Sequence, residues 1–165
     1  MSARTAYEYN LRNWSDIQAH LAKLFDGAQG ECLEIGVRSG VSTSAILAGL
    51  EERGGFLHSV DMQNCPIFEG HPQWQFIQSD SVKCWPELLQ VLPGSLDMLF
   101  VDGDHTYEGA LSDLRHFGVR AKTIFVHDTD APDFPGVRQA VEQYCDETKR
   151  PVIYYGESYG MAEIR

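Results

Sequence analysis

The chain has 165 residues, a length that suits one hydrophobic core and is short for two ordinary domains. Apolar residues make up 43% of the chain, which argues against overall disorder. Its 24 Asp and Glu against 13 Lys and Arg give a formal net charge of −11. This balance disfavours nucleic acid and acidic membrane surfaces as partners, because both require a basic face. A small neutral or cationic molecule fits the charge better.

The composition also predicts the compartment. The four cysteines, at positions 32, 65, 84 and 145, have neither zinc-site nor Cys-x-x-Cys spacing. Residues 1–10 lack the apolar core of a signal peptide. The longest apolar runs, about five to seven residues, are far shorter than the roughly 20 that a membrane span needs. We therefore expect reduced thiols and a cytoplasmic protein with a single domain over residues 1–165.

Short apolar runs alternate along the chain with longer runs of helical periodicity, which is typical of a parallel sheet with crossover helices. Residues 1–29 are expected to form an N-terminal helical segment, with a helix in which Trp14, Ile17, Leu21, Leu24 and Phe25 recur at helical spacing. The predicted strands are 31–35, 56–60, 74–77, 96–101, 122–126, 152–155 and 161–164. The later predicted helices are 41–52, 81–91, 106–117 and 136–147.

Two details of this reading depend on local chemistry. Pro86 falls inside the predicted helix 81–91, so it must lie in the first turn or kink the helix. The last two strands can pair as a hairpin. Tyr154, Tyr155 and Tyr159 in this hairpin could line a pocket, but the preference of strands for aromatic residues explains them equally well.

The residues after each strand form the candidate site, because ligands of open α/β sheets bind beyond the carboxyl ends of the strands. Loop 36–40 follows the first strand and lacks the Gly-x-Gly-x-x-Gly pattern of a pyrophosphate-binding loop. The Glu34 carboxylate just before it would repel a phosphate and could face a cation. Asp61, after the second strand, could accept both hydroxyls of a ribose or simply cap a turn. Asp80, after the third, could bind an adenine amino group or cap the next helix.

Three stretches together carry a resemblance: Leu33-Glu-Ile-Gly-Val-Arg-Ser-Gly40, Asp61, and Phe100-Val-Asp-Gly-Asp-His-Thr-Tyr107. They resemble class I S-adenosylmethionine (SAM)-dependent methyltransferases. The narrower similarity is to small-molecule O-methyltransferases, a group that includes macrolide-sugar and cephalosporin-biosynthesis-related enzymes. The resemblance covers residues 30–145. It implies an α/β, Rossmann-like fold with a seven-stranded, mostly parallel sheet of order 3-2-1-4-5-7-6, strand 7 antiparallel, and helices on both faces.

The resemblance also implies which residues hold the cofactor. The expected SAM contacts are Glu34, Gly36, Ser39, Gly40, Asp61, Met62, Asp80, Ser81 and Asp102.

A metal site is implied at the ends of the fourth and fifth strands. The implied order makes these strands neighbours, about 4.8 Å apart, so Asp102 and Asp128 could reach one ion. Oxygen ligands suit Mg²⁺. His127 stands where relatives often have Glu or Asp, and its nitrogen suits Mn, Fe or Zn better. The expected ligands are therefore Asp102, His127 and Asp128, with Mg or Mn as the ion. The alternative is a solvated acidic rim without metal.

His105 and Asp102 are the expected catalytic residues. Related sugar methyltransferases look similar here, with an Asp-x-x-His whose histidine is the general base. A histidine with an ordinary pKa near 6.5 can accept a hydroxyl proton at neutral pH. The alternative for His105 is a residue that bonds locally at the start of a helix.

The expected function is SAM-dependent O-methylation of a small hydroxylated molecule such as a sugar. Two other functions stay open. One is a non-catalytic SAM-binding or interaction module, since the chain lacks the insertions that usually build a substrate lid. The other is an oxidoreductase acting with NAD or on a nucleotide-sugar, against which the missing third glycine and Glu34 both weigh. Without a lid, the acceptor site is either open or completed by a second subunit of a homo-oligomer.

Overall fold

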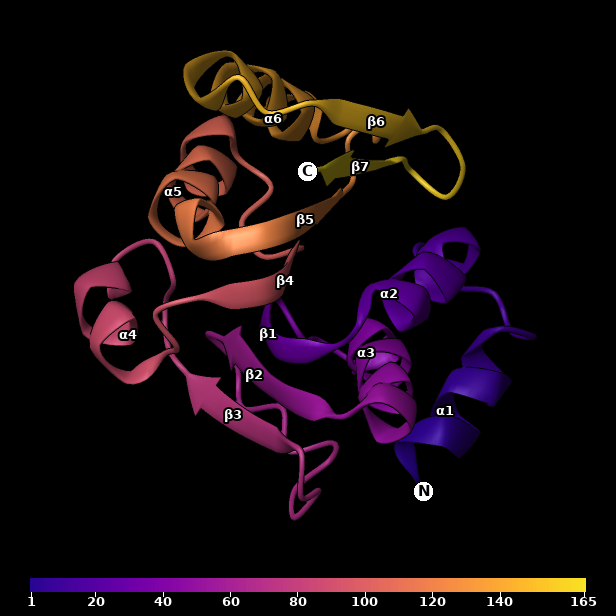
Figure 1. The fold of residues 1–165 in the computed structure, drawn as a ribbon. Coiled ribbons are helices and arrows are strands. Elements are labelled where there is room, and N and C mark those ends of the chain that lie inside the picture. The colour runs from indigo at the N-terminus through magenta and orange to yellow at the C-terminus, as the bar shows by residue number, and fades with distance from the viewer.

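The computed structural model describes all 165 residues, in which seven strands form one sheet with helices on both faces (Figure 1). The strands are β1 (Gly30–Ile35), β2 (Gly55–Asp61), β3 (Trp74–Gln78), β4 (Leu96–Val101), β5 (Ala121–His127), β6 (Val152–Tyr155) and β7 (Met161–Ile164). The α-helices are α1 (Ala3–Asn10), α2 (Leu21–Gly27), α3 (Val41–Arg53), α4 (Trp85–Val91), α5 (Tyr107–Phe117) and α6 (Pro135–Thr148). Short 3₁₀ helices span Gln18–His20 and Gly118–Arg120.

The strand order is β3-β2-β1-β4-β5-β7-β6, which confirms the predicted fold. Strands β1 to β5 are parallel, whereas β7 runs antiparallel to both β5 and β6. In the register, Ile35 lies beside Val101, and Val101 lies beside Val126. The residues that follow β1, β4 and β5 therefore meet at one edge of the sheet.

Successive side chains of the central strands point to opposite faces of the sheet, so a hydrophobic core forms on each face. On β4, Leu99 and Val101 pack with α4, α5 and α6, while Met98 and Phe100 pack with α1, α2 and α3. Figure 1 shows these two helical layers on opposite sides of the sheet. Both faces of the sheet are therefore covered, and the carboxyl-end edge is where side chains can meet a ligand.

The N-terminal segment is helical, but only the second half of the predicted helix through Trp14 and Phe25 forms, as α2 (Leu21–Gly27). The Ser2 hydroxyl caps α1 by accepting the N–H of Thr5, and α1 then packs in the core with α3. Residues 11–17 form an irregular connection, so Trp14 is 82% exposed. Ile17 is buried from that irregular segment, which shows that the apolar spacing did not arise from one continuous helix.

The predicted helix 81–91 begins later, at Trp85. Pro86 lies in its first turn, where the missing N–H costs no helical hydrogen bond. Residues 81–84 form a turn instead, and Ser81, Val82 and Lys83 of this turn line a pocket at the carboxyl edge of the sheet. No helix combines the length and apolar character that crossing a membrane requires.

Candidate active site at the carboxyl edge of the sheet

Two adjoining hollows lie along the carboxyl edge. The β2-side pocket, of about 500 Å³, lies over the ends of β1, β2, β3 and β4. The β5-side pocket, of about 480 Å³, lies over the ends of β4 and β5. Both volumes suit a small molecule. The residues common to both pockets are Gly36, Arg38, Asp102 and His105.

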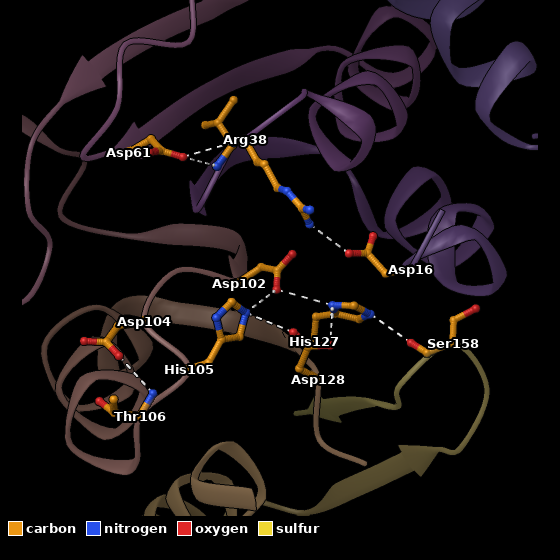
Figure 2. Close-up of polar contacts among 11 residues, drawn as sticks. Asp16, Arg38, Asp61, Asp102, Asp104, His105, Thr106, His127, Asp128 and Ser158 are labelled. Atoms are coloured by element: carbon orange, nitrogen blue, oxygen red, sulfur yellow. Dashed lines mark hydrogen bonds and ion pairs between the residues drawn. The ribbon is translucent and has the colours of Figure 1, made fainter. Parts of the chain in front are cut away.

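Gly36 and Asp61 shape the loop between these pockets. Gly36 has a φ of 92°, and a Cβ placed on it would lie 2.1 Å from the carbonyl oxygen of Asp102. Only glycine lets the loop pass so close to the end of β4. One carboxylate oxygen of Asp61 accepts the N–H groups of Val37 and Arg38, at 2.8 and 3.0 Å (Figure 2). Asp61 therefore fixes this loop and also borders the β2-side pocket.

Six expected cofactor contacts line the β2-side pocket: Gly36, Asp61, Met62, Asp80, Ser81 and Asp102. Asp80 combines both roles considered for it. Its Oδ1 accepts the N–H groups of Val82 and Lys83, at 3.0 and 3.1 Å, and Lys83 pairs with it at 3.0 Å. The hydrogen bond from Lys83 lowers the pKa of Asp80. The role of these six residues as SAM contacts stays a prediction.

The other three expected contacts lie outside both pockets. Glu34 is fully buried, and its carboxylate accepts hydroxyl hydrogen bonds at 2.6 to 2.8 Å from Ser42, Thr43 and Ser59. Burial raises the pKa of Glu34 to about 7. The structure does not place Glu34 at either pocket, because its carboxylate joins β1 to β2 and α3.

Ser39 and Gly40 are the other two expected SAM contacts that lie outside the pockets. Ser39 is exposed to solvent, and Gly40 precedes α3 with a φ of 75° and packs against Ile67. Neither residue lines either pocket. The glycine at this position therefore permits the turn into α3.

Two carboxylates and two imidazoles form a cluster at the ends of β4 and β5 (Figure 2). Oδ1 of Asp102 lies 3.4 Å from Nε2 of His105 and 3.3 Å from Nδ1 of His127. Oδ2 of Asp128 lies 2.9 Å from Nε2 of His105. Asp128 has a left-handed φ of 62°, a strained conformation for a residue with a side chain. This turn beyond β5 leaves its carboxylate in contact with His105.

The two imidazoles of the cluster hold their protons more tightly than a free histidine does. The carboxylates of Asp102 and Asp128 raise the pKa of His105 to about 10. Burial lowers the pKa of His127, but Asp102 outweighs it and brings that pKa to about 9. Burial would raise the pKa of Asp102, yet its hydrogen bonds with the two histidines lower it. With this pKa His105 is an imidazolium at neutral pH, and it cannot act as a base until the carboxylate charge is compensated.

The groups able to share an ion differ from the expected set. One ligand atom from each of Asp102, His105 and Asp128 lies within 4.8 Å of the others. His127 stands beside this set: its Nε2 donates to the carbonyl oxygen of Ser158 at 2.9 Å, and its Nδ1 lies 3.3 Å from carboxylate oxygens of Asp102 and Asp128 (Figure 2). Its role as a metal ligand stays a prediction, and in this structure it supports Asp102 and the β6–β7 loop.

The aromatic wall of the β5-side pocket was not predicted. It consists of Trp14, Phe134 and Tyr159, which are all exposed. The His105 ring stacks on Phe134, with centroids 4.4 Å apart. The sequence offers Tyr159 as a candidate pocket residue, whereas helical spacing places Trp14 in a helix. No sequence signal joins these three residues, because they come from separate segments.

Known protein families and solved structures were compared with this chain. The family model for a methyltransferase domain matches residues 33–129. No curated protein sequence matches significantly. The similar solved structures include three methyltransferases. CalS11, a TDP-rhamnose 3'-O-methyltransferase of calicheamicin biosynthesis, has a TM-score of 0.66 at 15% identity, over 89% of this chain and 76% of that one.

The methyltransferase PaMTH1 of Podospora anserina, bound to S-adenosylhomocysteine (SAH), has a TM-score of 0.65 at 16% identity, over 99% of this chain and 86% of that one. MycE, of the mycinamycin pathway, was solved with Mg, SAH and mycinamycin VI. It has a TM-score of 0.71 at 12% identity, over 100% of this chain and 54% of that one. The chain thus spans about half the length of MycE, and at these identities the likeness shows the fold.

Proposed function

The chain belongs to the methyltransferase domain family, and on that premise we propose that it transfers the methyl group of SAM to a hydroxyl of a small molecule such as a sugar. The observation that carries this proposal is the junction of the two pockets. They share Asp102 and His105, so a donor in one and an acceptor in the other would meet at those residues. Methyl transfer is an in-line displacement, in which positioning of the two reactants supplies much of the catalysis.

The β2-side pocket suits the donor. SAM carries an ammonium and a sulfonium and has no phosphate, so carboxylates are suitable neighbours. Asp61 accepts three backbone N–H groups, from Val37, Arg38 and Gln63, which leaves about one of the four lone-pair sites of its carboxylate for a ribose hydroxyl. The two basic residues that line this pocket already form ion pairs with carboxylates. Lys83 pairs with Asp80, and Arg38 pairs with Asp16 at 2.9 Å. SAM supplies a methyl group activated by the positive sulfur.

The β5-side pocket suits the acceptor. Its aromatic wall offers flat apolar surface, and Asp102 and Asp128 supply hydrogen-bond acceptors for a hydroxyl. His105 lies between these surfaces, with Nε2 in contact with both carboxylates. We assign to this nitrogen the proton that leaves the acceptor hydroxyl. CalS11, a TDP-rhamnose 3'-O-methyltransferase, and MycE, solved with mycinamycin VI, support the choice of a hydroxylated acceptor by analogy.

A divalent cation, Mg²⁺ or Mn²⁺, fits the chemistry of Asp102 and Asp128, whose carboxylates supply the hard oxygen ligands that such ions prefer. One nitrogen lone pair cannot serve both the ion and the proton, so we assign the ion to the two carboxylates and leave His105 free. Such an ion supplies Lewis acidity at the acceptor hydroxyl. Positive charge between the carboxylates would also cancel the field that raises the pKa of His105.

Binding and turnover test this function separately. Calorimetry should show SAM binding to the wild type at micromolar concentrations, and an absence of binding at millimolar SAM would end the proposal. With a panel of glycoside acceptors, His105→Ala should lower turnover and leave SAM affinity nearly unchanged. His116→Ala, on α5 outside both pockets, is the control. Equal turnover in the two variants would remove His105 from the base role.

The metal assignment has its own experiment. Asp128→Asn should weaken Mn²⁺ binding, measured by calorimetry or electron paramagnetic resonance, by at least about tenfold. Asp133→Asn removes one carboxylate from the same β5-side pocket without touching the cluster, and should bind Mn²⁺ as the wild type does. If the two variants bind Mn²⁺ equally well, the ion does not lie at Asp128.

A further inference from the structure

A buried carboxyl group without a partner lies next to the β2-side pocket. Asp113, on α5, is completely buried, and neither of its carboxylate oxygens makes a hydrogen bond. Most buried polar groups in proteins are hydrogen-bonded, since an unpartnered one costs folding free energy. The two catalytic pockets do not include Asp113, so its cost to the fold is unexplained by the site described above.

Asp113 lies where two walls of the β2-side pocket meet. A Cβ placed on Gly103, in the connection from β4 to α5, would lie 3.8 Å from Oδ2 of Asp113. On the other side, Ser81 comes from the connection between β3 and α4. Burial raises the pKa of Asp113 to about 7, against the opposing effect of the nearby Ser81 hydroxyl. Gly103 and Ser81 both line the pocket.

The Ser81 hydroxyl is a suitable partner for Asp113. The Ser81 residue is buried, and its hydroxyl lies near enough to Asp113 to lower the pKa of that carboxyl against the effect of burial. The neighbouring Asp80 carboxylate already caps the N–H groups that follow it, so it leaves Ser81 unengaged. A hydroxyl donor and a carboxyl acceptor that approach each other in this way can be joined by rotation of either side chain.

We propose that Asp113 is a positioning residue of the donor site: its carboxyl accepts the Ser81 hydroxyl when SAM is bound and holds that wall of the pocket against Gly103. The inference rests on the proposed function, which assigns SAM to this pocket. Asp113 does not itself line the pocket, so its effect on the donor passes through Ser81.

A residue with only a structural role would behave differently. Replacing an unpartnered buried carboxyl with an uncharged side chain of similar size should keep or raise the free energy of unfolding. If Asp113 served the fold alone, Asp113→Asn and Asp113→Leu would therefore change stability and leave donor affinity unchanged. A positioning role predicts instead that the affinity for the donor falls, although the fold is at least as stable.

The experiment measures SAH binding by calorimetry and unfolding in urea on the same full-length proteins. Asp113→Leu and Ser81→Ala should each weaken SAH binding by about 3- to 10-fold, the effect of one hydrogen bond. The double variant should be no weaker than the worse single variant, because both changes remove the same contact. Asp113→Asn, which keeps an acceptor oxygen, should bind SAH more tightly than Asp113→Leu. Glu108→Gln removes an exposed carboxylate from the same helix and should match the wild type.

Two results would overturn the positioning role and leave the methyltransferase function intact. One is SAH affinity equal to that of the wild type in both Asp113→Leu and Ser81→Ala. The other is a double variant whose loss of affinity is the full sum of the two single losses. If Asp113→Leu does not fold, the Asn variant and Ser81→Ala carry the same comparison. A wild type that binds neither SAM nor SAH overturns the proposed function and this inference together. With turnover available, the positioning role further predicts a higher KM for SAM at nearly unchanged kcat.

Discussion

Replacing Glu34 with Gln would show whether this carboxyl serves the fold or the ligand. In the folded protein its pKa rises from an ordinary 4.5 to about 7, chiefly because the group is fully buried. The folded state therefore binds this proton more tightly than the unfolded state. Its contribution to stability is fully present below pH 4.5 and is lost as the pH rises through 7.

The size of the effect follows from the pKa difference. At about 1.4 kcal/mol per pKa unit, ionised Glu34 costs about 3 kcal/mol at pH 8. Glutamine has nearly the same shape and does not titrate, and the three hydroxyls around it can rotate to suit an amide. Between pH 4.5 and pH 8 the stability difference should therefore shift by about 3 kcal/mol in favour of Glu34→Gln.

Urea unfolding at the two pH values measures this shift, and SAH calorimetry on the same samples measures the ligand. Glu31→Gln, on the same strand with a half-exposed carboxylate, controls for the loss of one charge and should differ little from the wild type. A Glu34→Gln stability difference that is equal at both pH values would refute the linkage argument. Weaker SAH binding at unchanged stability would restore Glu34 as a ligand contact.

Two further substitutions probe the sheet edge. Gly36→Ala should destabilise the protein by about 3 kcal/mol or more and abolish SAH binding, because its Cβ would meet the Asp102 carbonyl at a φ of 92°. Gly94→Ala, where a Cβ meets nothing within 4 Å, is the control in urea unfolding, and equal losses in the two would contradict the steric argument. Asp102→Asn should lower the pKa of His105 by about one unit or more, since it removes one of its two carboxylate partners. An NMR titration of the imidazole checks this, and an unshifted curve would show that Asp128 alone sustains the high pKa.

Several features of the site were predictable from local pattern. Parallel strands place whatever follows them at one edge of the sheet, so Asp61, Asp80 and Asp102 could be assigned to a common crevice from their positions in the chain. The family resemblance likewise assigned Asp102 and His105, three residues apart, to one site, and the structure brings their side chains within 3.4 Å. These predictions succeeded because they depend on strand order and chain connectivity, which hydrophobic periodicity and the family resemblance reveal.

The direction of individual side chains was decided only in three dimensions. A strand buried on both faces has no polar face to mark which side chains reach the ligand, so Glu34 could not be distinguished from a pocket residue until Ser42 and Ser59 were seen to surround it. The same holds for His127, whose partner Ser158 lies on a distant loop. Sequence alone determined the sheet and the edge where chemistry occurs. Long-range packing decided which carboxylates face the crevice, because contacts between residues far apart in the chain leave no local pattern.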